Sequence, residues 1–313
     1  MGLGSNQVVT GIDVGSSSVK VVRLAHRRSS SEVVGVALSE IPQGSSDETD
    51  ILDARKRVVA AINQALSSTG VDPGRAGTVV TSVSGPSVSV KHVAFPEMSD
   101  KELAESVRWE AKKHLPFDTD NVDLDYQKLG REDIEKNDER TQVLLGAAQS
   151  GVLVDHLDAL ADAGIEPTIV DLTPTALINE VDEEGLVNGQ AVAVADLGHR
   201  SASLSVYTRG GLFFARSIPI VPRQENWLEH VLTEVRFSLT FYNNETGRKG
   251  IESLYVAGGR SLESGVIGRF ADALGVPTEL LDPLASVGAF ELEGDLAAQS
   301  PRFALAMGLA RRR

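Results

Sequence analysis

Apolar and polar residues alternate along the first 76 residues in patterns typical of strands and of one helix. Runs of β-branched residues predict strands over 8–12, 19–24 and 32–41. The following segment, 51–67, has apolar residues at positions 51, 52, 58, 59, 62 and 66, which is the spacing of an amphipathic helix, and Gly70 ends it. The pattern predicts an α/β unit that opens with a strand hairpin.

The next segment, residues 77–165, reads as strand, helix, strand, strand and helix. Ser99 and Glu102 form a capping box that opens an amphipathic helix, and Pro116 closes that helix. We interpret this segment as an insertion within the first half of the chain. A strand at 168–172 and a short helix with Pro174 in its first turn then complete that half.

The second half repeats the same order of elements. The stretches AVAVADLG, SASLSVYTR and LFFARSIPI predict a three-strand meander, which a helix over 226–244 follows. A buried strand then ends in two glycines and leads to a helix over 262–274, a short strand and a last helix over 302–312. The sequence therefore predicts two copies of one α/β unit.

Each predicted hairpin carries an Asp, a Gly two positions later and then small hydroxylated residues. DVGSSSVK begins at Asp13, and DLGHRSAS begins at Asp196. One copy alone indicates no more than a tight turn with a glycine at positive φ. Two copies indicate a clasp for a polyphosphate, because glycine turns let backbone N–H groups approach phosphate closely. Two facing carboxylates would also need a cation such as Mg²⁺ between them.

Composition restricts the partners of the chain. The 313 residues carry a formal net charge of −14, which disfavours binding to nucleic acid and to anionic lipid. There is no cysteine, so disulfides and thiolate metal sites are excluded. No secretory signal and no apolar stretch of spanning length is visible, and we expect a cytosolic protein. The terminal Arg311, Arg312 and Arg313 are expected to form a solvated tail.

The order of these motifs resembles the actin, Hsp70 and sugar-kinase superfamily. Within it, the chain is identified as a member of the PilM family, the actin-like proteins of type IV pilus assembly. The resemblance covers nearly the whole chain. It is carried by GIDVGSSSVKVVRL, by the stretch from VKHVAFPEM through SVRWEAKKHLPF to VDLDYQKLG, by VLLGAAQSGVLVDHLDALADAGIEPTIVDL, and by LFFARSIPI, LYVAGGRS, LGVPTELLDPL and FALAMGLA.

The resemblance implies an actin-like ATPase fold: α/β, with two duplicated ribonuclease-H-like lobes, an inserted subdomain of the FtsA/PilM type and a reduced second lobe. The implied divisions are 1–76 and 166–188 for the first lobe, 77–165 for the inserted subdomain, 189–300 for the second lobe and 301–313 for a C-terminal connecting helix. Asp13 and Asp196 would hold Mg²⁺. The implied ATP site consists of Asp13, Gly15, Ser16, Ser17, Ser18, Lys20, Asp196, Gly198, Ser201, Gly258, Gly259 and Arg260.

The resemblance also implies a partner. PilM proteins bind the N-terminal cytoplasmic peptide of PilN, a single-span inner-membrane protein, and so act indirectly with the motor ATPases of a pilus or secretion machine. The protein is then expected in the cytoplasm, peripheral to the inner membrane. The formation of homo-oligomers is left as an open alternative. A plain packing helix with a buried Trp109 fits residues 99–114 equally well. The expected peptide groove is lined by Val90, His92, Phe95, Val107 and Trp109.

Three departures from the family pattern concern ATP hydrolysis. Ala202 replaces a threonine of relatives, and alternation along the strand is expected to point Ser201 and Ser203 to the other face. Thr173 stands where relatives often have an acidic residue, and threonine is no general base near neutral pH. After Ile220 the chain lacks a segment that covers adenosine in relatives.

These departures favour a scaffold that binds ATP and Mg²⁺ weakly if at all and hydrolyses ATP slowly or not at all. Two alternatives stay open. The first is an active actin-superfamily ATPase or phosphotransferase, and the second is an FtsA-like protein that forms filaments.

Overall fold

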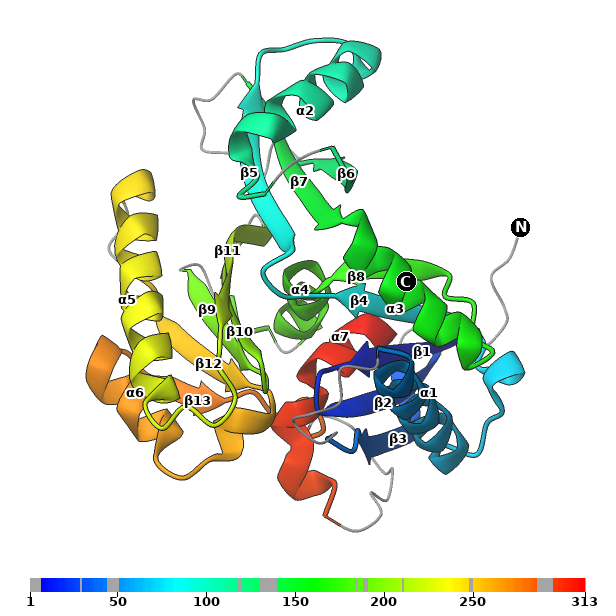
Figure 1. The fold of residues 1–313 in the computed structure, drawn as a ribbon. Coiled ribbons are helices and arrows are strands. Elements are labelled where there is room, and N and C mark those ends of the chain that lie inside the picture. The colour runs from blue at the N-terminus through cyan, green and yellow to red at the C-terminus, as the bar shows by residue number, and fades with distance from the viewer. Residues whose placement is uncertain are drawn as a thin grey trace.

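The described part of the chain forms two lobes and a smaller subdomain that projects from them (Figure 1). Each lobe is built around a mixed five-stranded sheet, and the projecting subdomain contains a three-stranded sheet. The computed structural model describes residues 7–28, 30–43, 51–117, 120–129, 140–183, 185–187, 191–209, 211–247, 250–285 and 295–312.

The first sheet has the strand order β3-β2-β1-β4-β8. Its central strand β1 pairs antiparallel with β2 and parallel with β4, and in this register Asp13 lies opposite Lys20. The strands are β1 (Gln7–Val14), β2 (Ser18–His26), β3 (Ser31–Glu40), β4 (Thr78–Val83) and β8 (Ile169–Leu172).

The second sheet repeats this arrangement, with the strand order β11-β10-β9-β12-β13. Its central strand β9 pairs antiparallel with β10 and parallel with β12, as β1 does with β2 and β4. The predicted duplication is therefore confirmed by the topology. The strands are β9 (Val192–Leu197), β10 (Ser201–Thr208), β11 (Gly211–Pro219), β12 (Ser253–Ala257) and β13 (Thr278–Leu280).

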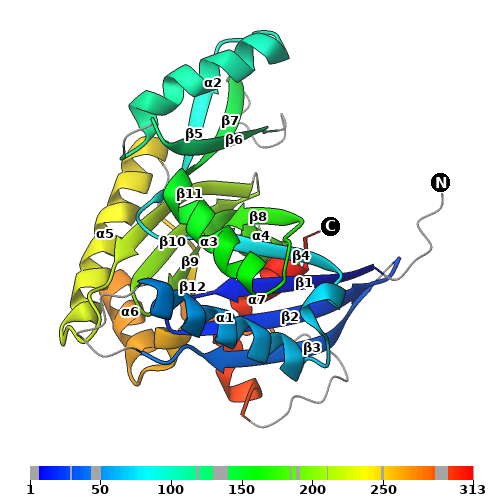
Figure 2. The same ribbon diagram turned by 45° about the vertical axis from the view of Figure 1, so that its right-hand side comes forward.

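Helices cover both faces of the first sheet. On one face α1 (Ile51–Ser68) lies beside α3 (Ser150–Asp162), and their apolar side chains share one core with β1 and β2 (Figure 2). On the other face α4 (Thr173–Glu183) packs against α7 (Ala304–Ala310). A Cβ atom at Gly11 would lie 2.1 Å from the Ala306 carbonyl oxygen, so glycine is what lets β1 contact α7 this closely.

The helices of the second lobe are α5 and α6. The first, α5 (Trp227–Thr246), ends at Gly247, whose φ is 62°. Apolar residues of both helices, among them Val231, Val235 and Phe270, pack into the core of the second sheet. The second helix is shorter than the expected 262–274: a 3₁₀ turn, Gly259–Leu262, comes first, and α6 (Val266–Leu274) begins after Gly265, whose φ of 81° interrupts the helix.

The inserted subdomain is smaller than the predicted 77–165. It consists of β5 (Val88–Phe95), α2 (Asp100–His114), β6 (Val122–Lys128) and β7 (Thr141–Gln149), in the sheet order β5-β7-β6. The capping box of Ser99 and Glu102 is present as predicted. The boundaries are corrected because β4 pairs with β1 and β8 in the first sheet, and because α3 packs into the first core. Strand pairing and helix packing assign both elements to the first lobe.

The C-terminal segment also differs from its prediction. It folds as a 3₁₀ segment, Ala297–Phe303, which contains Pro301, followed by α7. Arg311 is not part of a solvated tail, because its Nε lies 2.8 Å from the carboxylate of Glu180, whose side chain is fully buried. Arg312 lies 3.6 Å from Asp171, and Arg313 is outside the described residues. Within the described part of the chain, none of the helices has the length and apolar character needed to cross a bilayer.

Candidate functional site

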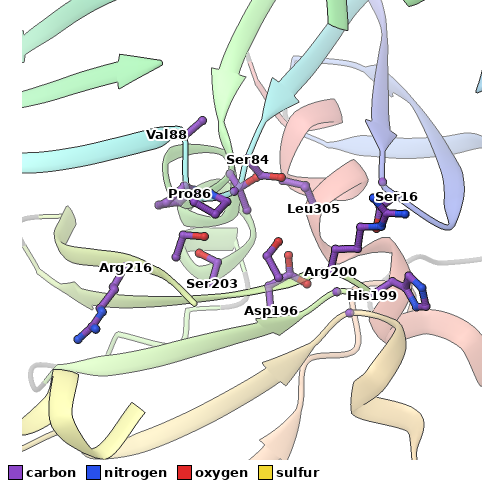
Figure 3. Close-up of a pocket in the computed structure, with 18 of the residues that line it drawn as sticks. Ser16, Ser84, Pro86, Val88, Asp196, His199, Arg200, Ser203, Arg216 and Leu305 are labelled. Carbon is purple, nitrogen blue, oxygen red and sulfur yellow. The ribbon is translucent and has the colours of Figure 1, made fainter. Parts of the chain in front are cut away.

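A cavity of about 1240 Å³ lies between the lobes and is bordered by both predicted hairpin turns (Figure 3). The first turn joins β1 to β2, and the second joins β9 to β10. The structure brings all the residues of the predicted ATP site into the wall of this one cavity: Asp13, Gly15, Ser16, Ser17, Ser18, Lys20, Asp196, Gly198, Ser201, Gly258, Gly259 and Arg260.

The two turns have the same backbone hydrogen bond. The N–H of Gly15 donates to the Ser18 carbonyl, and the N–H of Gly198 donates to the Ser201 carbonyl, both at 3.0 Å. A Cβ atom at Gly198 would lie 2.8 Å from the Ser201 carbonyl oxygen, so a larger residue would force this turn open. The tight turns place short side chains and backbone at the cavity from two sides.

The first turn is held by charged groups. Lys20 Nζ lies 2.9 Å from the Asp13 carboxylate, and both side chains are nearly buried. Arg302, from the C-terminal segment, donates to the hydroxyl of Ser18 at 3.0 Å and to Glu40 at 2.7 Å. Arg302 therefore binds two residues, Ser18 and Glu40, that lie 284 and 262 positions before it in the chain. Nothing in the local sequence indicates these contacts.

Asp196 is the acidic group of the second turn, and it points into the cavity (Figure 3). Burial and the negative charge of Asp13 raise the pKa of Asp196 to about 6, against an opposing effect of Lys20. Gly258 follows β12 with a φ of 85°, and a Cβ atom there would lie 2.6 Å from Asp196 Oδ1. The carboxyl group fits only because residue 258 has no side chain.

The side chains of the strand after the second turn, β10, lie on the faces opposite to the predicted ones. Ser201 and Ser203 line the cavity, whereas Ala202 is buried in the core of the second lobe. The prediction that these serines point away from the site is therefore wrong. The turn places Ser201 at the cavity, and the period of two along β10 then places Ser203 there as well.

Thr173 begins α4 and lines the cavity. Its hydroxyl is buried and makes no hydrogen bond to any residue that the structure describes. An acceptor in the cavity could satisfy this hydroxyl. As a threonine, it supplies no carboxylate to deprotonate a water molecule.

His156 supports the strand end that carries Asp13. The hydroxyl of Thr81 donates to the Ile12 carbonyl at 2.9 Å and lies 2.8 Å from His156 Nε2, so the imidazole N–H donates to the hydroxyl. Burial lowers the pKa of His156 to about 4, although Asp13 acts in the opposite direction, and the ring is therefore neutral near pH 7. Sequence reasoning missed this residue because its contacts come from another element.

Sequence reasoning also missed the wall that α5 provides. Phe237 and Phe241, one helical turn apart, line the cavity, and this spacing was the available signal. Trp227, at the start of α5, lies beneath the guanidinium of Arg260 at 4.5 Å from the ring centre. The other ionisable lining residues that were not predicted are Lys91, His199, Arg200, Arg216, Arg223, Glu263 and Arg302.

The residues of the predicted peptide groove lie in different surroundings. Phe95 and Val107 are buried in the core of the inserted subdomain, so neither is on a surface. Val90 is buried and borders the interlobe cavity, and the ring of His92 lies 5.4 Å from that of Phe213. Trp109 is 75% exposed, so the alternative of a buried Trp109 is wrong.

The acidic residues of the cavity can bind a metal ion only if a bound ligand, such as a phosphate, supplies further coordinating groups. Among the described residues, no cluster of three or more His, Asp or Glu side chains could hold a metal ion by itself. Mg²⁺ bound to phosphates needs one or two carboxylates, often through water. Asp13 and Asp196 fit this requirement, because burial and the charge of Asp13 raise the pKa of Asp196 and a cation between the two carboxylates would favour the ionised form of Asp196.

Comparisons with known proteins agree with this geometry. The family model of the type IV pilus assembly protein PilM matches residues 11–220 and 224–313, and its interruption falls where the sequence suggested a missing segment. A solved PilM-PilN type IV pilus biogenesis complex contains a chain with 25% identity and a TM-score of 0.80, over 98% of both chains.

A second solved structure shares the fold alone. It is a Bacteroides thetaiotaomicron protein with an actin-like ATPase fold and unknown function, with 10% identity and a TM-score of 0.53, over 90% of this chain and 95% of that one. The twofold lobes around one cavity are thus an actin-like fold. Because the family model matches almost the whole length, this chain belongs to the family of type IV pilus assembly protein PilM.

Proposed function

We propose that this protein is a scaffold of a type IV pilus or related secretion machine, bound at the inner membrane through a PilN-like partner. The observation that carries the proposal is the match over 98% of the chain to a protein solved as a PilM-PilN complex. In this proposal the protein lies in the cytoplasm, binds the N-terminal cytoplasmic peptide of the partner, and acts only indirectly with the motor ATPase.

The inserted subdomain is our proposed docking site for the peptide. Trp109 supports this choice, because it is the most exposed of the large apolar side chains among the described residues. Exposed tryptophans are frequent anchors of protein interfaces. Phe95 and Val107 would then support the subdomain from inside and not contact the peptide.

The interlobe cavity is our proposed site for ATP. The glycine turns at Gly15 and Gly198 would hold the phosphates from two sides, and the unpaired hydroxyl of Thr173 would lie among them. Mg²⁺ would be held by the phosphates and by Asp13 and Asp196. We propose that hydrolysis is weak or absent, because Thr173 offers no general base.

The two tryptophans allow the proposed docking site to be tested by fluorescence. The chain has only Trp109, which is exposed, and Trp227, which is buried under Arg260. A peptide from the N-terminus of the PilN-like protein should shift the emission of the wild type and of Trp227→Phe. It should bind Trp109→Ala at least tenfold more weakly. Equal affinity for Trp109→Ala would reject the docking site, and no binding at all would reject the partner.

Titration calorimetry with ATP and Mg²⁺, beside an Asp13→Ala control, tests the cavity. We expect binding that the variant weakens, and phosphate release no faster than that of the variant. Rapid phosphate release lost in Asp13→Ala would favour an active ATPase or phosphotransferase instead. Nucleotide-dependent growth of light scattering would favour an FtsA-like filament protein.

A further inference from the structure

The part of the cavity beside α5 has an aromatic wall that the two hairpin turns do not share. Phe237 and Phe241, one turn apart on this helix, line the cavity and are 62% and 48% exposed. The ring of Phe214, on β11, also lines the cavity and lies 6.1 Å from the ring of Phe241. Exposed apolar side chains that lie together in this way commonly mark an interaction site. We call this part, with Lys91 and Arg216, the aromatic end of the cavity.

Two cations lie beside the aromatic wall. The guanidinium of Arg216, on β11, lies 5.3 Å from the ring centre of Phe237 and 2.6 Å from the carboxylate of Glu234. Lys91, on β5, lines the same cavity and forms no ion pair with any residue that the structure describes. Burial and then the positive charge of Arg216 lower the pKa of Lys91. Two positive charges therefore share one carboxylate, and a further anion would stabilise the charged form of Lys91.

The aromatic end of the cavity is separate from the hairpin turns and is shared by two parts of the molecule. In Figure 3, Arg216 lies on the opposite side of the cavity from Ser16 and His199. Strand β5 of the inserted subdomain lies against β11 of the second lobe, and the ring of His92 lies 5.4 Å from that of Phe213. A ligand at this end would contact both parts without needing the glycine turns.

We propose that the aromatic end of the cavity binds an acidic peptide segment of a partner protein. A large apolar side chain of the peptide packs on Phe237 and Phe241, and a carboxylate next to it pairs with Lys91. A peptide fits this end better than a small anion, because a small anion would leave both phenyl rings in water. The formal net charge of −14 disfavours nucleic acid and anionic lipid, whereas a short acidic segment needs only local charge complementarity.

This site is distinct from the docking site proposed at Trp109 and from the proposed ATP site. Trp109 is on α2 of the inserted subdomain and does not line the cavity. The inference therefore goes beyond the proposed function, and neither of the two depends on the other.

The test begins with a phage-displayed library of random short peptides, which is selected on the immobilised full chain. The enriched peptides are then synthesised with a fluorescein label, and their affinities are measured by fluorescence anisotropy. The variants are Lys91→Gln, Lys91→Arg and the double variant Phe237→Ser with Phe241→Ser. Thermal melting followed by circular dichroism checks that each variant is folded.

Two matched controls change exposed residues that do not line the cavity. Lys101→Gln removes an exposed lysine of the same subdomain as Lys91. Val154→Ser removes an apolar side chain of α3 that is 52% exposed, close to the exposure of Phe241. Trp109→Ala reports whether a peptide binds at the other docking site.

We expect enriched peptides that combine aspartate or glutamate with a large apolar residue. The double phenylalanine variant should bind them about tenfold or more weakly, and Lys91→Gln about fivefold or more weakly. Lys91→Arg, which keeps the charge, should lose less, and both controls and Trp109→Ala should change the affinity by less than about twofold. A selection that enriches no peptide, or only peptides without acidic residues, would overturn the inference. Acidic peptides whose affinity falls only in Trp109→Ala, or in none of the variants, would overturn it as well.

Discussion

Gly258 lies where the end of β12 meets the end of β9, beside the carboxyl group of Asp196. A Cβ atom at this position would lie 2.5 Å from the Leu197 carbonyl oxygen and 2.6 Å from Asp196 Oδ1. The first of these atoms belongs to the backbone of a central strand and cannot move without disturbing the sheet. Gly258→Ala should therefore displace Asp196 and weaken the binding of a phosphate ligand.

The magnitude has two parts. Gly258 has a φ of 85° and a ψ of 170°, a backbone region open essentially to glycine alone, which costs an alanine about 1–3 kcal/mol, and the forced contact adds about 1–3 kcal/mol as overpacking does. We expect Gly258→Ala to lower the free energy of unfolding by about 3 kcal/mol in chemical denaturation. Gly265→Ala is a control for positive φ without a close contact, because Gly265 has a φ of 81° and a ψ of −6°, in the left-handed helical region, with open space around it, and should lose only about 1–2 kcal/mol. Equal losses in the two variants would refute the argument from close contact.

Three further predictions follow from single groups. Asp196, whose pKa is raised to about 6, favours the folded state increasingly as the pH falls through that value. Asp196→Asn should thus be more stable than wild type at pH 7.5, by up to about 3 kcal/mol, with a difference that shrinks toward pH 4; a less stable variant at pH 7.5 would contradict this. Arg311→Met removes the ion pair of the buried Glu180 and should cost about 3–5 kcal/mol in chemical denaturation, part of which Glu180→Gln restores. Thr173→Glu places a carboxylate at the cavity and should raise phosphate release at least tenfold; unchanged release would mean that a missing base does not limit hydrolysis.

Sequence patterns were most reliable where a local rule acts. The capping box at Ser99 starts α2 as predicted, and the two D-x-G turns at Asp13 and Asp196 occur in both lobes. Patterns failed where the partner of an element decided its role. The strand at 78–83 is equally apolar whether it belongs to an insertion or to the first sheet, and only its pairing with β1 and β8 assigns it to the sheet.

The sequence by itself determined the duplicated order of elements, the glycine turns and the acidic residues near the end of the first strand of each half. These features depend on the conformations of neighbouring residues, which local steric limits and side-chain periodicity fix. Only the tertiary structure decided that Arg200 extends toward the opposite turn, that Arg302 holds Ser18, and that Gly258 leaves room for Asp196. Such contacts join residues far apart in the chain, and their distances follow from how the two sheets pack around α4 and α7.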